Sequence, residues 1–293
     1  MEEHEENDRV CPNCGWQEAR GPEDALEIGS ILEGRYIVGA VRCRGASDYL
    51  YVGWDALFLR RVLILEYFPE EGVTRGADGR VEADPGQRDR FLHGLRGLLE
   101  DGRKLIMLDD TPGLLNVFAV TEDFGTGYVI MDYPEAKVLA ELWQEQRVWE
   151  PHKVQELIQK LSSPLAAAHN MGVCHGQIDE NHILILPGGD CLLGGFHGDL
   201  SAKKPTVSRE RQDGIRRDIE ALARLAGSML TGTRRWEQQS LDENLDFMRE
   251  TMPECIPDAL RAVLGIDETR RPGSARRFAD LFLDEATIEL AQP

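Results

Sequence analysis

Strand-like runs occupy the first half of the chain, and helical runs occupy the second half. From residue 34, short stretches rich in β-branched and aromatic residues follow one another, separated by turn residues such as Gly45. One stretch with apolar residues at helical spacing interrupts this series after the third strand. Later, two long amphipathic stretches end at Gly172 and Gly232, as helices often do at glycine. The pattern predicts an α+β chain of two lobes, a β-rich lobe over residues 34–133 and an α-rich lobe over residues 134–293.

The charge balance argues against several classes of partner. The 293 residues include 52 acidic and 33 basic side chains, a formal net charge of −19, whereas binding to phosphates needs clustered lysine and arginine. No apolar run reaches the roughly 18 residues that span a bilayer. We therefore expect neither a nucleic-acid nor a membrane partner. Six scattered cysteines and a negatively charged first segment fit a cytoplasmic protein better than a secreted one.

Residues 1–33 are interpreted as an acidic arm separate from the core. They contain ten acidic residues against Arg9 and Arg20, which favours either a solvating tail or a specific ligand over a packed element. Cys11 and Cys14 form a C-x-x-C turn with zinc-ribbon spacing, but a closed zinc site needs four ligands and no second pair is present. A vestigial turn and a zinc site shared by two chains both remain open. We expect no other cofactor.

Several strings, in this order, resemble motifs of the protein kinase family. The β-rich half contains GRYIVGAV and then VLILEYFP, which is similar to the third strand of a bacterial Ser/Thr kinase group. The α-rich half contains HNMGVCHGQIDENHILI in the place of the catalytic loop, RRDIEALARLAGSMLTG in the place of helix F, and DETRRPGSARRF near the end. The resemblance implies a two-lobed kinase-like fold, with a β-rich N-lobe that contains helix C and an α-helical C-lobe.

The resemblance identifies N-lobe positions where a kinase holds phosphates, and this chain differs there. Three glycines normally let the phosphate-binding loop approach closely. Their positions hold Cys43, Gly45 and Asp48. Asp48 would add negative charge beside a polyphosphate, and Leu65 replaces the phosphate-holding lysine. Leu63 replaces a small alanine and would fill space that adenine needs. Asp101, in the place of the helix C glutamate, is expected to lack a mate.

The catalytic loop also differs at its charged positions. The arginine, aspartate, lysine and asparagine of the family motif align in that order with Gly176, Gln177, Asp179 and His182. Gln177 cannot accept a proton as a carboxylate does, and Asp179 reverses a positive charge. The aspartate of the D-F-G motif aligns with Gly195, so the principal ligand for Mg²⁺ is missing.

Residues that support the fold in the family are retained. They are Leu105, His175, Phe196, Asp218 and Arg271. We expect Leu105, His175 and Phe196 to stack as an apolar spine. We expect Asp218 to accept hydrogen bonds from the catalytic-loop backbone, and Arg271 to pair with Glu210.

Two further groups allow alternative readings. His175, His182 and His197 would suit a transplanted metal centre, but one core histidine and two solvent-facing ones fit the pattern better. Six basic residues in the activation-segment region form either a docking face or a solvated loop. They are Lys203, Lys204, Arg209, Arg211, Arg216 and Arg217.

Folding residues are therefore kept where reaction residues are lost, a pattern typical of a pseudokinase. We expect a catalytically inactive protein that binds no Mg-ATP and acts as a scaffold or allosteric regulator. Its expected partner is another protein, such as an active kinase, a phosphatase or another enzyme of the same pathway. The alternatives are a transferase of another class that reuses the fold and a sensor that binds a nucleotide without reacting. Both need charged groups that Leu65 and Gly195 do not supply.

Overall fold

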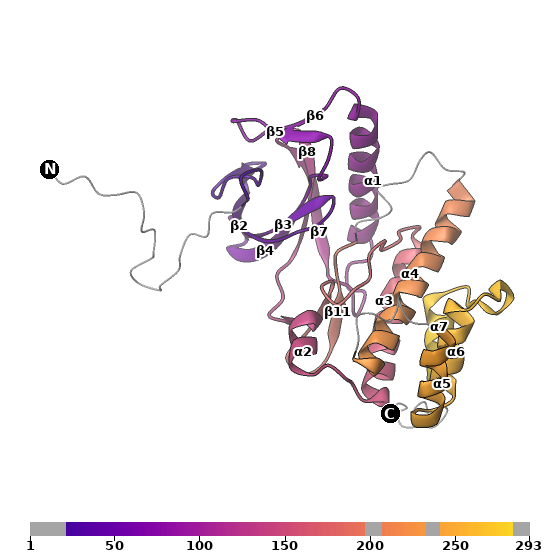
Figure 1. Ribbon diagram of the computed structural model, residues 1–293. Helices are drawn as coiled ribbons and strands as arrows, with labels where there is room; N and C mark the ends of the chain where they lie inside the picture. The colour runs from indigo at the N-terminus through magenta and orange to yellow at the C-terminus, as the bar shows by residue number, and fades with distance from the viewer. Residues whose placement is uncertain (1–21, 197–206, 233–240, 284–293) are drawn as a thin grey trace. The chain divides into compact units, whose positions relative to one another are not determined.

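The computed structural model describes residues 22–196, 207–232 and 241–283, except for the side chains of residues 207–210. The chain divides into two compact units. The first contains the described residues up to Leu95 together with Thr121–Tyr133, and the second contains Arg96–Val120 and the described residues from Pro134 onward. The first unit is built on a sheet and the second is mainly helical (Figure 1), which confirms the predicted α+β organisation. The first unit ends at Tyr133, and Arg96–Val120 belong to the second.

A six-stranded sheet organises the first unit, in the order β1-β2-β3-β4-β8-β7. Its strands are β1 (Ile31–Leu32), β2 (Tyr36–Arg44), β3 (Asp48–Asp55), β4 (Arg60–Tyr67), β7 (Val117–Asp123) and β8 (Thr126–Asp132). Strands β2, β3 and β4 are antiparallel neighbours joined by tight turns. Helix α1 (Arg88–Ile106) begins in this unit, where Phe91 stacks on Tyr67 with 5.3 Å between the ring centroids. Glycine is required at Gly94, because a Cβ atom there would clash with the Tyr67 hydroxyl.

A short hairpin lies within the Gly- and Asp-rich stretch of residues 71–87. Its strands are β5 (Val73–Arg75) and β6 (Val81–Ala83). Arg75 forms a buried ion pair with Glu66 of β4, at 2.8 Å. Glu66 also accepts hydrogen bonds from the hydroxyls of Tyr51 and Tyr128, at 2.6 and 2.8 Å. Burial, followed by the charge of Glu66, raises the pKa of both tyrosines. The ion pair between Arg75 and Glu66 therefore attaches the hairpin to the sheet. The buried Glu66 carboxylate is stabilised by this arginine and by the two tyrosine hydroxyls.

The last part of the predicted acidic arm packs against the same sheet. Leu26 and Leu32 are buried, and the backbone N–H of Leu26 donates to the Tyr51 hydroxyl at 3.0 Å. Asp24 accepts a hydrogen bond from Tyr49. The prediction of an arm separate from the core is therefore wrong for residues 22–33, because β1 pairs with β2 and carries Leu32 into the core. Residues 1–21, with Cys11 and Cys14, lie outside the described residues.

The second unit combines helices with a small sheet. Its helices are α2 (Leu139–Glu145), α3 (Pro151–Asn170), α4 (Val207–Thr231), α5 (Leu241–Thr251), α6 (Cys255–Leu264) and α7 (Ala275–Phe282), and a 3₁₀ turn spans Glu268–Arg270. Its strands are β9 (Lys137–Val138), β10 (Ile183–Ile185) and β11 (Cys191–Leu193). Helix α3 packs against α4 and α7, and α6 packs against both α5 and α7 (Figure 1).

Local sequence signals explain several of these elements. Pro151 opens α3, a position where the missing N–H costs nothing, and Gly172 follows the end of that helix with a φ of 76°. Strands β10 and β11 form a hairpin whose turn contains Pro187-Gly188-Gly189. Helix α4 begins at Val207, nine residues before the predicted start at Arg216. Within the described ranges, none of the helices combines the length and apolar character needed to cross a membrane.

Candidate functional site

The loop between α3 and β10 is anchored by one carboxylate. Asp218 of α4 accepts hydrogen bonds from the backbone N–H groups of His175 and Gly176, at 2.7 and 2.8 Å. Its Oδ2 atom also lies 2.8 Å from Nε2 of His169 on α3. These hydrogen bonds from the loop backbone are the ones expected for Asp218. The carboxylate ties three segments of the second unit together.

His175 points into the core of this unit. Its side chain is fully buried, and Nε2 lies 2.8 Å from the carbonyl oxygen of Gly194. Its ring packs on Phe196 with 4.5 Å between centroids. Leu105, the third residue of the expected spine, is also buried in this unit. His175 therefore serves as a core residue and leaves Phe196 fixed beside it.

Asp179 and His182 form an ion pair in place of the groups that a kinase would use there. Asp179 Oδ1 lies 2.7 Å from Nδ1 of His182 and accepts a second hydrogen bond from the backbone of Asn181, at 2.8 Å. Burial acts to raise the pKa of Asp179, but the hydrogen bond and charge of His182 outweigh it and lower the pKa to about 2. The prediction that His182 faces solvent is wrong, because the ring is only 17% exposed and turns toward Asp179.

The ring of His182 also occupies the space beside Gly195. A Cβ atom on Gly195 would clash with Cδ2 of this ring. Gly195 has a φ of 75°, a conformation that other residues adopt at a cost. An aspartate at this position, as in the family motif, does not fit the observed arrangement. The residues present at Gly195 and His182 therefore do not form a carboxylate site for Mg²⁺.

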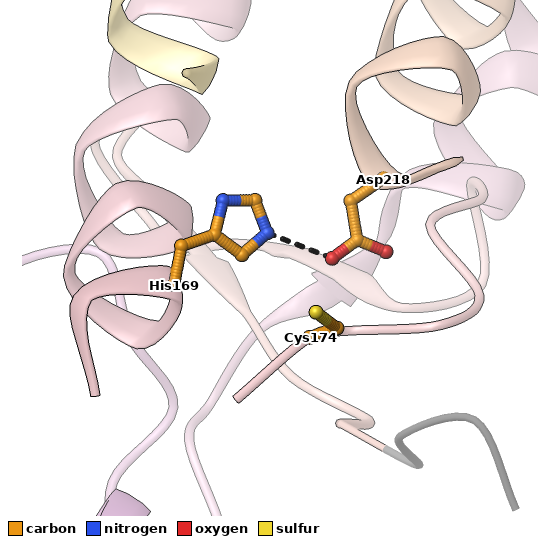
Figure 2. Close-up of side chains that lie close together, drawn as sticks. All are labelled: His169, Cys174 and Asp218. Carbon is orange, nitrogen blue, oxygen red and sulfur yellow. Dashed lines mark hydrogen bonds and ion pairs between the residues drawn. The ribbon is translucent and has the colours of Figure 1, made fainter. Parts of the chain in front are cut away.

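A second cluster in this unit has the composition of a metal site. His169, Cys174 and Asp218 bring one ligand atom each to within 4.8 Å of one another, and Figure 2 shows the His169 ring directed at the Asp218 carboxylate with the Cys174 sulfur nearby. Both carboxylate oxygens already accept hydrogen bonds. Burial, followed by the charges of Asp218 and Asp101, raises the pKa of Cys174 to about 12, so its thiol stays protonated.

The arrangement of this cluster suits hydrogen bonding better than metal binding. Nδ1 of His169 is buried and has no hydrogen-bond partner among the residues that the structure describes, whereas a ligating histidine normally donates its other ring N–H. His169 and Cys174 stand in the string HNMGVCHGQIDENHILI, but the resemblance implies no functional role for either. The sequence contained a signal for this cluster, since only five residues separate His169 from His175 and Gly172, with a φ of 76°, lies between them.

In the first unit, Leu63 and Leu65 lie on β4 and are both buried. The sheet register places Leu65 between Leu50 of β3 and Val129 of β8. Residues opposite one another on antiparallel strands share a face, so Leu65 packs in an apolar row. A lysine ammonium in that row would need a buried acidic partner.

The residues aligned with the glycine-rich loop form a closed β-turn. Cys43 is exposed, and the N–H of Gly45 donates to the carbonyl of Asp48 at 2.9 Å. The Asp48 side chain is buried and folds over Gly45, since a Cβ atom on Gly45 would lie 2.7 Å from Asp48 Oδ1. Arg44 crosses the turn and donates to the carbonyl of Asp48 at 3.0 Å. The turn is filled by its own side chains.

Asp101 has a partner, contrary to the prediction. Nζ of Lys104, one turn further along α1, lies 3.0 Å from Asp101 Oδ1. Burial raises the pKa of Asp101, and Lys104 opposes this only in part. The resemblance implies a partner for Asp101 only at the position of Leu65. The actual partner, Lys104, lies three residues further along the same helix.

The basic residues of α4 are engaged in contacts within the unit. Arg211 donates to the backbone carbonyls of His169 and Asn170 at the end of α3, at 2.6 and 3.3 Å. Arg216 lies 3.2 Å from Glu220. The contacts of Arg211 and Arg216 favour a structural role for these two arginines over a role in a docking face. The other members with no described side chain are Lys203, Lys204 and Arg209, and His197 is likewise outside the described residues.

Arg271 pairs with acids other than the expected one. Its Nη1 atom lies 3.2 Å from Glu268 and 3.7 Å from Glu220. The side chain of Glu210, the expected partner, lies outside the described residues.

A sheet with one inserted helix, followed by a helical unit that contains the His175 loop and the Asp218 anchor, defines a protein-kinase-like fold of two lobes. No family model matches the chain. The chain is 25% identical, over 285 residues, to the serine/threonine-protein kinase PknL of Mycobacterium tuberculosis and of Mycobacterium bovis. The match covers 90% of this chain and 66% of those relatives, so the chain spans just under two thirds of their length.

Solved structures agree on the fold. The PpkA-294 apo form has a TM-score of 0.70 and 20% identity, and the match covers 89% of this chain and 100% of that one. The Mycobacterium tuberculosis PknI kinase domain has a TM-score of 0.64 and 22% identity, with 91% and 100% covered. The sequence prediction of a kinase-like fold is confirmed.

Proposed function

We propose that this chain is a pseudokinase that binds no Mg-ATP and acts by binding another protein. The observation that carries the proposal is the packing of His182 against Gly195. Phosphoryl transfer depends on metal ions that neutralise the phosphates, held by carboxylate and amide oxygens. This chain has a glycine and an imidazole at the two aligned positions, and the imidazole is held in place by Asp179.

The first unit supports the same proposal independently. Leu65 offers no charge to a phosphate and packs between Leu50 and Val129. Asp48 covers Gly45 within its own turn, so the backbone there is less open to a phosphate. Loss of charge in both units favours a role that needs no phosphoryl chemistry.

The short stretch of chain before α4 also supports the proposal of a pseudokinase. Ten residues, 197–206, separate Phe196 from Val207, where α4 begins. The resemblance places an activation segment here, and so short a stretch leaves little chain for docking a peptide substrate. PknL, by contrast, is named a serine/threonine-protein kinase, and at 25% identity its activity is not carried over to this chain.

Nucleotide titration tests the proposal. Thermal unfolding of the full chain is followed with ATP, with and without Mg²⁺, and with an active kinase domain as positive control. A ligand that binds the folded state stabilises it by about 2.7 kcal/mol at 100 times its Kd. We expect no shift. A shift that requires Mg²⁺ would support a transferase, a shift without phosphate transfer would support a nucleotide sensor, and either would overturn the proposal.

A further inference from the structure

Three adjacent apolar side chains project from the turn between β3 and β4. Leu57, Phe58 and Leu59 are 65%, 63% and 72% exposed. Single exposed hydrophobic residues are ordinary, but contiguous ones mark interaction sites. Packing within the first unit does not explain these three side chains, since most of the surface of each is exposed.

The turn holds these side chains in a fixed geometry. The buried carboxylate of Asp55 accepts hydrogen bonds from the backbone N–H groups of Leu57 and Phe58, at 3.1 and 3.3 Å. Arg35 donates two hydrogen bonds to the same carboxylate, at 2.9 and 2.7 Å. Leu59 has a φ of 53°, which is uncommon for a residue with a side chain. Strain of this kind persists where the surroundings enforce it, and such positions concentrate at functional sites.

An apolar row on the sheet continues from this turn. The register pairs Ile31 with Ile37, Ile37 with Trp54, and Trp54 with Arg61, across β1 to β4. These residues share one face of the sheet. Ile31 is 51% and Trp54 39% exposed. We call Leu57, Phe58, Leu59, Ile31 and Trp54, with the arginines described next, the β3–β4 patch.

Arginines surround these apolar side chains. The guanidinium groups of Arg35 and Arg60 lie 5.0 and 5.7 Å from the centroid of Phe58. Those of Arg61 and Arg42 lie 5.7 and 5.9 Å from Tyr133. Within residues 22–196, 207–232 and 241–283, no acidic side chain forms an ion pair with Arg42 or Arg61. Arg35 and Arg60 are paired with Asp55 and Asp132, so the remaining positive charge at this apolar centre comes from Arg42 and Arg61, in a chain with a net charge of −19.

We propose that the β3–β4 patch docks an acidic segment of another protein that carries a bulky apolar side chain. Arginine clusters recognise acidic segments, and aromatic and aliphatic anchors supply the binding energy at the centre of such sites. A second copy of this chain would bring the same arginines against each other in a two-fold interface. The inference rests on the proposed function and specifies the class of partner.

A peptide selection tests the inference. Random short peptides displayed on yeast are selected on the full chain, and enriched peptides are labelled and titrated by fluorescence anisotropy at low and high salt. We expect enriched peptides that combine acidic residues with Phe, Trp or Leu and that bind more weakly at high salt. Phe58→Ser and Arg61→Glu should each weaken binding by about tenfold or more.

Control variants outside the β3–β4 patch, and tests for other occupants of the patch, complete the experiment. Phe247→Ser on α5, 56% exposed, and Arg277→Glu on α7 should leave peptide affinity unchanged. Selection of neutral or basic peptides, or equal binding to Phe58→Ser, would overturn the inference. It would also be overturned by a dimer that Phe58→Ser dissociates, or by a photo-crosslinker at position 58 that captures residues 1–21 of the same chain. Failure of the proposed function appears separately, as an ATP-dependent thermal shift.

Discussion

Nη2 of Arg75 and Oε2 of Glu66 lie 2.8 Å apart inside the first unit, with side chains that are 6% and 0% exposed. Arg75→Met would leave the Glu66 carboxylate buried without its cation. Removing one partner of a buried pair costs about 3–5 kcal/mol, and the two tyrosine hydroxyls that remain on Glu66 place the expected loss near the lower value. Urea unfolding, fitted for the free energy of unfolding, measures it.

The exposed pair of Arg60 with Asp132 is the control for Arg75→Met. Its atoms lie 3.1 Å apart, and the side chains are 44% and 39% exposed. Arg60→Met should cost less than about 1 kcal/mol, because solvent screens exposed pairs. Equal losses for the two variants would show that Arg75 does not anchor the hairpin.

Asp218→Asn should destabilise the second unit by about 2–4 kcal/mol. Asp218 accepts hydrogen bonds from His175, Gly176 and His169, and an asparagine would turn one donor group toward those donors. Hydrogen bonds to charged groups contribute about 1.5–3 kcal/mol each. The free energy of unfolding measures the loss, and hydrogen exchange at the amides of His175 and Gly176 locates it. Asp213→Asn, on an exposed face of the same helix, should change little, and unchanged exchange in Asp218→Asn would contradict this anchor role.

The order of motifs along the sequence predicted those elements of the fold that depend on local sequence signals. Runs of strand-forming residues between turns predicted β2 to β4, of which β4 is buried over residues 62–67. Pro151 and Gly172 frame α3 as capping rules require. The hydrogen bonds of Asp218 follow from its place in the helix F string. Turn and capping signals in short stretches of sequence predict the elements, and the resemblance to the kinase family predicts the hydrogen bonds of Asp218.

Other features depend on contacts that the sequence does not encode locally. Glu66 stands in the VLILEYFP string and Arg75 in a loop-like stretch, and only the hairpin of β5 and β6 brings them together. The close approach of the His182 ring to Gly195 also depends on the turn geometry, since the two residues are thirteen positions apart. Residues 22–33 are rich in acidic side chains, which predicted a separate arm. The segment nevertheless packs on the sheet, where Leu26 and Leu32 are buried.

The Asp179–His182 pair should make stability depend on pH in the acidic range. The pKa of Asp179 is lowered in the folded state from 3.8 to about 2. A lowered pKa stabilises the folded state fully above the unfolded pKa, and that contribution is lost as pH falls from about 4 to about 2. This contribution is at most about 2.5 kcal/mol, because one pKa unit corresponds to about 1.4 kcal/mol.

The comparison of wild type with Asp179→Asn isolates this contribution from other carboxylates. At pH near 6 the variant should be less stable, and the difference should shrink toward zero near pH 2. Urea unfolding at several pH values measures it. A difference that stays constant over this range would show that Asp179 does not titrate in contact with His182.

A double-mutant cycle tests whether His182 occupies the space beside Gly195. Gly195→Ala should lose about 2 kcal/mol or more, because the positive φ is costly with a side chain and the new Cβ meets the imidazole ring. His182→Ala removes the ion pair with Asp179 and should cost less. In the double variant the clash is gone, so the combined loss should be smaller than the sum by about 1 kcal/mol or more. The four free energies of unfolding give the coupling directly. Additive losses would mean that the ring and the glycine are independent, and the argument against a metal ligand at Gly195 would then lose its steric basis.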